Sequence, residues 1–144
     1  MTPKRIQGFS LIEAVIVMVI MCLVAVWAAP SFITMRDKSY LKGSAESLLG
    51  HLAEARLEAI RSNTPVDVSF DNLLSDISTE ASIATPTFGD ISLDPKLAML
   101  EDPSQEGSVD ITRGSYTIRF GITPIGQGYI CDPVSSAVGY PPCP

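Results

Sequence analysis

The stretch Gly8-Phe9-Ser10-Leu11-Ile12-Glu13 is the most informative part of the chain, and an apolar run that ends at Ala29 follows it directly. The 21 residues from Phe9 to Ala29, taken as a helix with a rise of about 1.5 Å per residue, span a hydrocarbon core of roughly 30 Å. Glu13 is the only charged residue in this run. Because a carboxylate inside a membrane helix costs about 2.5–3.5 kcal/mol on insertion scales, Glu13 needs a partner or a functional reason.

The residues before the run leave two ordinary explanations open. Met1–Gly8 is short and polar, and Lys4 and Arg5 give it positive charge of the kind that is retained in the cytoplasm. The chain can therefore begin with a secretory signal peptide cleaved near Val26-Trp27-Ala28, or with a plain membrane anchor. Neither explanation accounts for Glu13, which would interrupt the apolar core of a signal peptide.

Gly8, Phe9 and Glu13 in front of an apolar helix resemble the N-terminus of a type IV prepilin or a type II secretion pseudopilin. The resemblance implies that a membrane aspartyl peptidase cleaves after Gly8 and methylates the new N-terminus at Phe9. Glycine suits such a site because a residue without Cβ lets the peptidase approach the backbone closely. The resemblance also implies that Glu13, about 6 Å along the helix from the new terminus, pairs with the terminal amine of a neighbouring subunit. Two buried opposite charges that neutralise each other only in the correct stagger would fix the register of a filament.

Two further stretches carry a finer resemblance. Ala55–Asn63, followed by a valine-rich strand, resembles the H-type general secretion pathway pseudopilins and the fimbrial T/U-type minor pilins. Phe120–Gly126 is similar to their glycine-bearing strand end. The C-terminal third departs from that pattern because it is short and ends in a disulfide loop, which favours a type IV pilus minor pilin over a secretion pseudopilin.

Beyond the apolar run, the sequence predicts one small domain. The chain has 144 residues, and the 115 that follow Ala29 suffice for a single core. We expect a cleaved leader at 1–8, a transmembrane and assembly helix at 9–29, an amphipathic second half of that helix at 30–63, and a periplasmic β-rich domain at 64–144.

The second half of the helix has a clear pattern. Pro30 removes one backbone hydrogen bond and clashes with the preceding turn, so we expect a kink there. Helical spacing then continues through Arg61, and Pro65 ends the helix because it pushes Thr64 out of helical space. Apolar residues at spacings of three and four form one stripe that is expected to pack against a sheet: Leu41, Ala45, Leu48, Leu52, Ala55 and Ala59.

After Pro65 the period changes to two, which indicates strands. Val66–Phe70 alternates as a half-buried strand, and Ile91–Leu93 is a second, short one. Ser108–Thr112 and Ser115–Phe120 read as a hairpin around a tight turn at Arg113-Gly114. The stretch from Asp71 to Thr87 is rich in Ser, Thr and Asp and receives no assignment. The predicted fold class is therefore α+β, a long hydrophobic N-terminal helix packed on a small antiparallel sheet, which agrees with the pilin fold.

Cysteine usage predicts the compartment. Cys131 and Cys143 flank a segment rich in Pro, Gly and Ser, and we predict a disulfide between them, which implies an oxidising compartment. Closing so short a loop contributes about 2–3 kcal/mol in the chain-entropy model. Cys22 lies in the apolar run, where it acts as a small hydrophobe. No metal site is expected, since two cysteines without further Cys or His cannot complete a zinc shell.

We expect no enzymatic activity and no cofactor. His51 is the single histidine and has no nucleophile suggested beside it, so a surface or partly packed role is expected. The chain contains no phosphate loop, dinucleotide fingerprint or metalloprotease pair. Six acidic residues are expected to be solvated loop charges, with calcium binding as the alternative: Asp90, Asp94, Glu101, Asp102, Glu106 and Asp110. Their spacing does not match an EF-hand.

The resemblance implies a minor pilin or pseudopilin that primes or caps a type IV pilus filament. Its implied partners are other pilins or pseudopilins, the prepilin peptidase, the inner-membrane assembly platform and, before assembly, the lipid bilayer. Its implied first location is the bacterial inner membrane, which it crosses once with its C-terminal domain in the periplasm. After assembly its implied location is a periplasmic or surface filament. A minor pseudopilin of the type II secretion system, which pushes folded proteins across the outer membrane, is the alternative.

Two other function classes stay open. A tip module could bind DNA, for which only Arg113, Arg119 and Tyr116 are suitable, or adhere through Asp132–Pro142. The net charge of −6, which loss of the leader would make more negative, disfavours DNA as a partner. A secreted enzyme released by signal peptidase is the remaining class, and a mature N-terminus at Phe9 would exclude it.

Overall fold

The structure is a computed structural model that describes residues 10–135 and 138–143. The leader at 1–8, the cleavage site at Gly8 and the methylation site at Phe9 lie outside the described residues, so these three remain predictions. The chain divides into two units, Met1–Arg36 and Asp37–Pro144, which are described separately below.

One helix, α1 (Leu11–Ser62, 52 residues), runs through both units. In the first unit its large apolar side chains are exposed: Leu11 is 82% exposed, Trp27 85% and Met35 70%. Pro30 lies inside the helix, and the kink there stays a prediction. By length and hydropathy no single described helix is a candidate membrane span, but the bent pair Leu11–Trp27 and Pro30–Ser62 passes the same test together.

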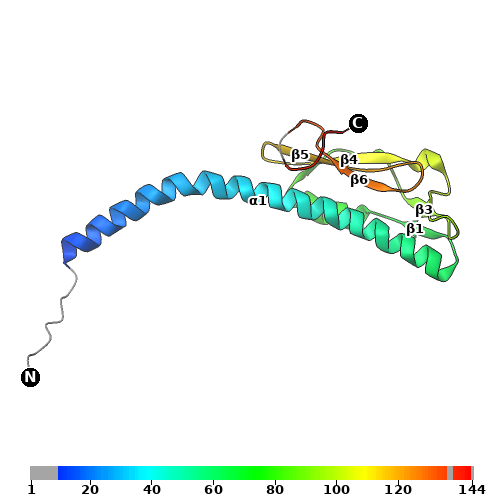
Figure 1. The fold of residues 1–144 in the computed structure, drawn as a ribbon, viewed down its shortest axis with the longest axis horizontal. Coiled ribbons are helices and arrows are strands. Elements are labelled where there is room, and N and C mark those ends of the chain that lie inside the picture. The colour runs from blue at the N-terminus through cyan, green and yellow to red at the C-terminus, as the bar shows by residue number, and fades with distance from the viewer. Residues whose placement is uncertain (1–9, 136–137, 144) are drawn as a thin grey trace, which may run out of the picture. The chain divides into compact units, whose positions relative to one another are not determined.

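The second unit adds two antiparallel sheets to the remaining part of α1 (Figure 1). The larger sheet has the strand order β2-β4-β5-β6, and the smaller one pairs β1 with β3. This confirms the predicted α+β class. The strands are β1 (Val66–Val68), β2 (Ser82–Ile83), β3 (Ile91–Leu93), β4 (Gly107–Arg113), β5 (Tyr116–Ile122) and β6 (Gly128–Cys131), with a short helix α2 (Asp71–Ser78) and a 3₁₀ turn η1 (Pro103–Gln105).

The core lies between α1 and the sheets. The predicted stripe on α1 is confirmed, because all six of its members are at most 9% exposed. They pack with the inward residues of β4 and β5 and with a group of three aromatic rings whose centroids are 5.4–6.1 Å apart, Phe70, Phe88 and Phe120. Each large side chain removed from water in this way contributes about 1.5–3 kcal/mol.

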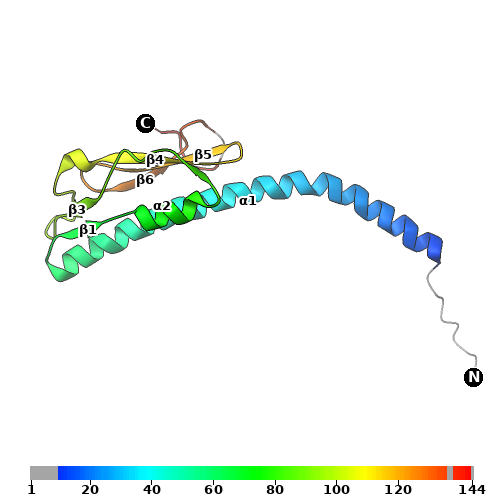
Figure 2. The ribbon, with the colours of Figure 1, turned by 180° about the vertical axis from the view of Figure 1, so that it is seen from behind.

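Two predicted elements differ from the structure. The strand expected at Val66–Phe70 ends at Val68, and α2 follows it (Figure 2). Phe70 directly precedes α2 and is buried in the core. The hairpin turn lies at Gly114-Ser115, one residue later than predicted, and Arg113 pairs with Tyr116 inside the ladder. Gly114 has φ +60°, which the first central position of such a turn requires and which glycine adopts without strain.

Four elements had no prediction, namely α2, β2, η1 and β6. α2 fills part of the polar stretch after Phe70, because Leu73, Leu74 and Ile77 lie on its inner face against the core. β2 has only two residues, and β6 begins with a glycine, so neither has the alternating pattern of a longer strand.

Candidate functional site

Glu13 lies in the first turn of α1 and is exposed. A carboxylate there is favourable, since the free N–H groups of a helix start carry partial positive charge. Among residues 10–135 and 138–143 no ion pair or side-chain hydrogen bond of Glu13 is found. The charge that would neutralise it in an apolar environment therefore has to come from outside the described residues.

The surface around Glu13 is apolar on every side of the helix. Monomeric soluble proteins rarely expose such large apolar patches, which instead mark membrane or protein contacts. The exposed apolar side chains are at least 46% accessible and run along the whole first part of α1: Leu11, Ile12, Val15, Ile16, Val17, Met18, Val19, Ile20, Met21, Leu23, Val24, Val26, Trp27, Phe32, Ile33 and Met35.

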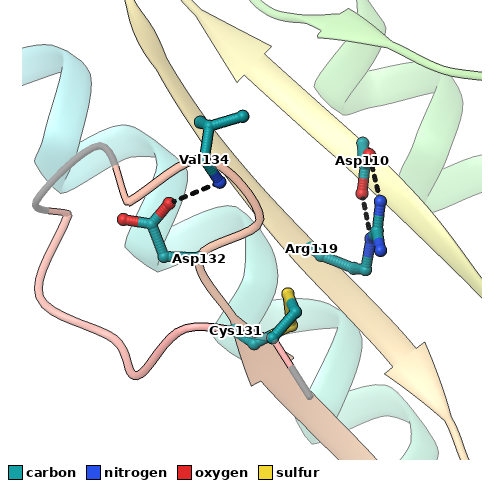
Figure 3. Close-up of a disulfide and its surroundings, with 6 residues drawn as sticks. Asp110, Arg119, Cys131, Asp132 and Val134 are labelled. Atoms are coloured by element: carbon teal, nitrogen blue, oxygen red, sulfur yellow. Dashed lines mark hydrogen bonds and ion pairs between the residues drawn. A yellow bond between two sulfur atoms is a disulfide. The ribbon is translucent and has the colours of Figure 1, made fainter.

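The predicted disulfide is present, and it closes the C-terminal segment on β6 (Figure 3). Cys131 ends β6, and its Cα lies 4.9 Å from that of Cys143. Asp132 N donates to Pro141 O over 2.8 Å, and Cys143 N donates to Asp132 O over 3.4 Å. The buried Asp132 carboxylate accepts from Val134 N at 3.2 Å. The two ends of the segment are thus joined by backbone hydrogen bonds as well as by the disulfide.

The same segment is fastened to α1. Val138 is 2% exposed and belongs to the core. Tyr140 Oη donates to Glu46 Oε1 over 2.9 Å, and Lys42 Nζ lies 5.8 Å from the centre of the Tyr140 ring. Partial burial, followed by the bond to Glu46, raises the pKa of Tyr140 above its ordinary value. Part of the segment Asp132–Pro142, which was considered above as an adhesion loop, therefore contacts the rest of this chain and is not free to bind another surface.

The two arginines considered for DNA are both in ion pairs. Arg119 makes a two-pronged contact with Asp110 across β4 and β5, at 2.6 and 2.8 Å, and this hydrogen bonding raises the pKa of Arg119 (Figure 3). Arg113 donates to Asp37 at 3.0 Å and to Glu80 at 2.8 Å. Their charges are thus compensated by neighbouring carboxylates rather than offered to phosphate groups.

A shallow hollow of about 750 Å³ lies beside the disulfide. Its walls include Tyr129, Pro141 and Pro142. Tyr129 is the cross-strand partner of Gly121, and a Cβ at position 121 would collide with the Tyr129 ring, so glycine lets the ring lie on the sheet. The hollow is mostly apolar in lining and brings together no acid–base pair.

Several loop carboxylates considered as calcium ligands have partners within the chain. Asp94 accepts from the backbone N–H groups of Leu97 and Lys96, which lowers the pKa of Asp94. Asp102 caps η1 by accepting from Ser104 N, which lowers its pKa in the same way. In the part of the chain that the structure describes, no three His, Cys, Asp or Glu side chains are arranged to hold a metal ion.

The structure also brings together residues that sequence reasoning missed. Asp37, Tyr40 and Glu80 gather around Arg113, although Asp37 is 76 residues away from it. No local sequence pattern predicts such a contact, because the periodicity of side chains along one element carries no information about a partner on another element. His51 is half-buried with its ring 5.6 Å from that of Phe70, as expected for a partly packed residue.

Comparison with known proteins identifies one feature. Residues 3–29 match the family model of the prokaryotic N-terminal methylation motif. This stretch contains Gly8, Phe9 and Glu13, and the match supports a place among pilins and pseudopilins. No curated protein and no solved structure matches the chain.

Proposed function

We propose that this chain, which carries the prokaryotic N-terminal methylation motif, is a minor pilin that primes or caps a type IV pilus. The observation that carries the proposal is the motif itself, at residues 3–29. The two parts of α1 support it, because a filament subunit needs an apolar helix for its neighbours and a folded domain of its own. Among the described residues, α1 exposes its large apolar side chains before Asp37, whereas after Tyr40 it buries the stripe from Leu41 to Ala59 and leaves Leu57 and Ile60 exposed.

In this proposal the chain is first a membrane protein and a peptidase substrate. The membrane peptidase cleaves after Gly8 and methylates the amine of Phe9. The mature amine keeps its positive charge after methylation. The acidic domain, whose Cys131–Cys143 bridge suits an oxidising compartment, lies in the periplasm.

Glu13 then supplies the specificity of assembly. Its carboxylate pairs with the methylated amine of a neighbouring subunit, and a buried charge pair tolerates one stagger far better than others. The exposed apolar side chains of Leu11–Met35 leave the lipid and pack among the helices of other subunits. An assembly ATPase supplies the energy that extracts the apolar helix from the bilayer. The inner-membrane assembly platform links this ATPase to the subunit.

A minor pseudopilin of the type II secretion system is the second candidate. The stretch Ala55–Asn63 is compatible with it, since this stretch resembles the H-type pseudopilins as well as the fimbrial T/U-type minor pilins. A DNA-uptake module at the tip is less favoured, because Arg113 and Arg119 are paired with carboxylates.

A clean deletion scored for two outputs tests the proposal. Surface pili with twitching motility report on one machine, and release of secreted proteins into the medium reports on the other. Loss of pili with normal secretion supports the type IV pilus subunit. Retained periplasmic cargo with normal pili assigns the chain to type II secretion instead, and normal output of both contradicts either filament role. Complementation with the unaltered chain is the control.

A further inference from the structure

Arg113, at the end of β4, joins three parts of the Asp37–Pro144 unit. Its Nε donates to Asp37 Oδ1 on α1 over 3.0 Å, and one terminal nitrogen donates to Glu80 Oε2, just after α2, over 2.8 Å. The guanidinium lies 4.2 Å from the centre of the Tyr40 ring. Only 13% of the Arg113 side chain is exposed. One side chain thus connects α1, the end of α2 and the β4–β5 hairpin.

The contacted residues on α1 have a special place. Asp37 begins the second unit, and Tyr40 lies one turn further on. Tyr40 also donates from its hydroxyl to Ile77 O over 3.4 Å. The buried apolar stripe starts directly afterwards at Leu41, which is fully buried, whereas Met35 is 70% exposed. The Arg113 contacts therefore coincide with the point where α1 changes from an exposed helix to a packed one.

The chemistry of arginine suits this position. Its planar fork can donate to two carboxylates at once while its face stacks on an aromatic ring, which the single ammonium of lysine cannot do. Arg119 offers an internal comparison, since its ion pair with Asp110 joins β4 to β5 and, within the described part of the chain, involves no residue of α1.

We propose that Arg113 is a latch that sets the N-terminal limit of the rigid part of α1. With the latch closed, α1 is held to the domain from Asp37 onward. Without it, the helical turns from Asp37 to Lys42 open locally, the first stripe residue Leu41 included, while the turns fixed by the stripe residues from Ala45 onward stay closed. One consequence rests on the proposed function. If the chain is a filament subunit, a pulling force on α1 is transmitted to the domain at Asp37 rather than at a later residue of the buried stripe.

Hydrogen exchange measured by mass spectrometry on the full chain in detergent micelles tests the latch. Arg113→Gln is expected to speed exchange of the amides at 37–42 roughly tenfold, because local opening exposes them without global unfolding. Exchange at 48–59 is expected to stay at the rate of the unaltered chain. Arg119→Gln is the matched control, with normal rates in both stretches.

Two results would overturn the latch. Unchanged exchange at 37–42 in Arg113→Gln would show that the contacts do not hold the helix, and an equal increase at 48–59 would show a general loosening instead. Should Arg113→Gln not fold, Asp37→Ala removes the carboxylate that Arg113 contacts on α1 and leaves Tyr40 and Glu80 in place. It is expected to speed exchange at 37–42, and rates there equal to those of the unaltered chain reject the proposal. None of these readouts depends on filament assembly, so the latch and the proposed function fail separately.

Discussion

The two parts of α1, before and after Asp37, contain similar apolar residues but differ in how far those residues are exposed. Leu23 before Asp37 is 61% exposed, whereas Leu48 after it is fully buried. The difference is in spacing rather than in hydrophobicity. After Asp37 most of the apolar residues form one stripe that the sheets cover, although Leu57 and Ile60 lie outside it and are exposed, whereas before Asp37 apolar residues occupy every face. A helix that is apolar all round needs a partner that the described residues do not contain, which is either lipid or other helices.

The largest expected effect concerns the one charge in the exposed part. Glu13→Ala should leave membrane insertion and processing intact but lower incorporation into the filament more than a hundredfold. The physical reason is that removing one partner of a buried charge pair costs about 3–5 kcal/mol. Quantitative immunoblots of sheared filaments measure incorporation. Glu54→Ala, an exposed glutamate on the packed part of the helix, is the control and should incorporate normally. Normal incorporation of Glu13→Ala would show that no such pair forms.

A matched pair of leucines sharpens the comparison directly. Leu48→Ala should destabilise the domain by about 2–5 kcal/mol, because a buried leucine is replaced by a cavity. Leu23→Ala should leave domain stability unchanged. Thermal unfolding in detergent, followed by near-UV circular dichroism of the four tyrosines, reports on the domain, since all four lie after Asp37. Equal effects of the two substitutions would contradict the division of α1 into two functional parts.

The disulfide is the next largest contributor to the packed part. Replacing Cys131 and Cys143 together by serine should cost about 3 kcal/mol, because the cross-link at a separation of 12 residues limits the unfolded chain. The same unfolding experiment measures the loss. Cys22→Ser is the control, as that thiol is free and lies in the exposed part. A double variant as stable as the unaltered chain would mean that the segment is held by its other contacts alone.

The smallest expected effect concerns the contact between the disulfide segment and α1. Tyr140→Phe should lower stability by about 1 kcal/mol or less, since one hydrogen bond to the exposed Glu46 is lost. In the unaltered chain the folded pKa of Tyr140 lies above its unfolded value of 10.0. The stabilisation is therefore complete below pH 10 and is lost as the pH rises through the folded pKa. Absorbance titration of the tyrosinates in both chains checks this, and a normal pKa for Tyr140 would contradict the contact.

The elements that could be predicted are those with a local signal. The stripe from Leu41 to Ala59 has helical spacing, Ile91–Leu93 alternates, and the two C-terminal cysteines leave one pairing once Cys22 is assigned to the apolar run. α2 could have been found from the spacing of Leu73, Leu74 and Ile77, but the surrounding Ser and Asp residues hid it.

Other features could not be predicted because their causes are not local. The hairpin turn shifted by one residue because Arg113 pairs in the ladder and Gly114 takes the positive φ. The ion pair of Arg113 with Asp37 depends on how α1 and the hairpin pack, which no stretch of sequence encodes by itself. At the proposed assembly site, Glu13 was identified from the sequence, while the partner proposed for it would belong to another molecule.

The most direct test of the central claim is the intact mass and N-terminal sequence of the chain after co-expression with a prepilin peptidase. We predict a mature protein that begins at Phe9 and carries one N-methyl group, whereas a Gly8→Leu variant should remain uncut. A chain cleaved near Ala28, or one that keeps its first eight residues in the presence of an active peptidase, would contradict it.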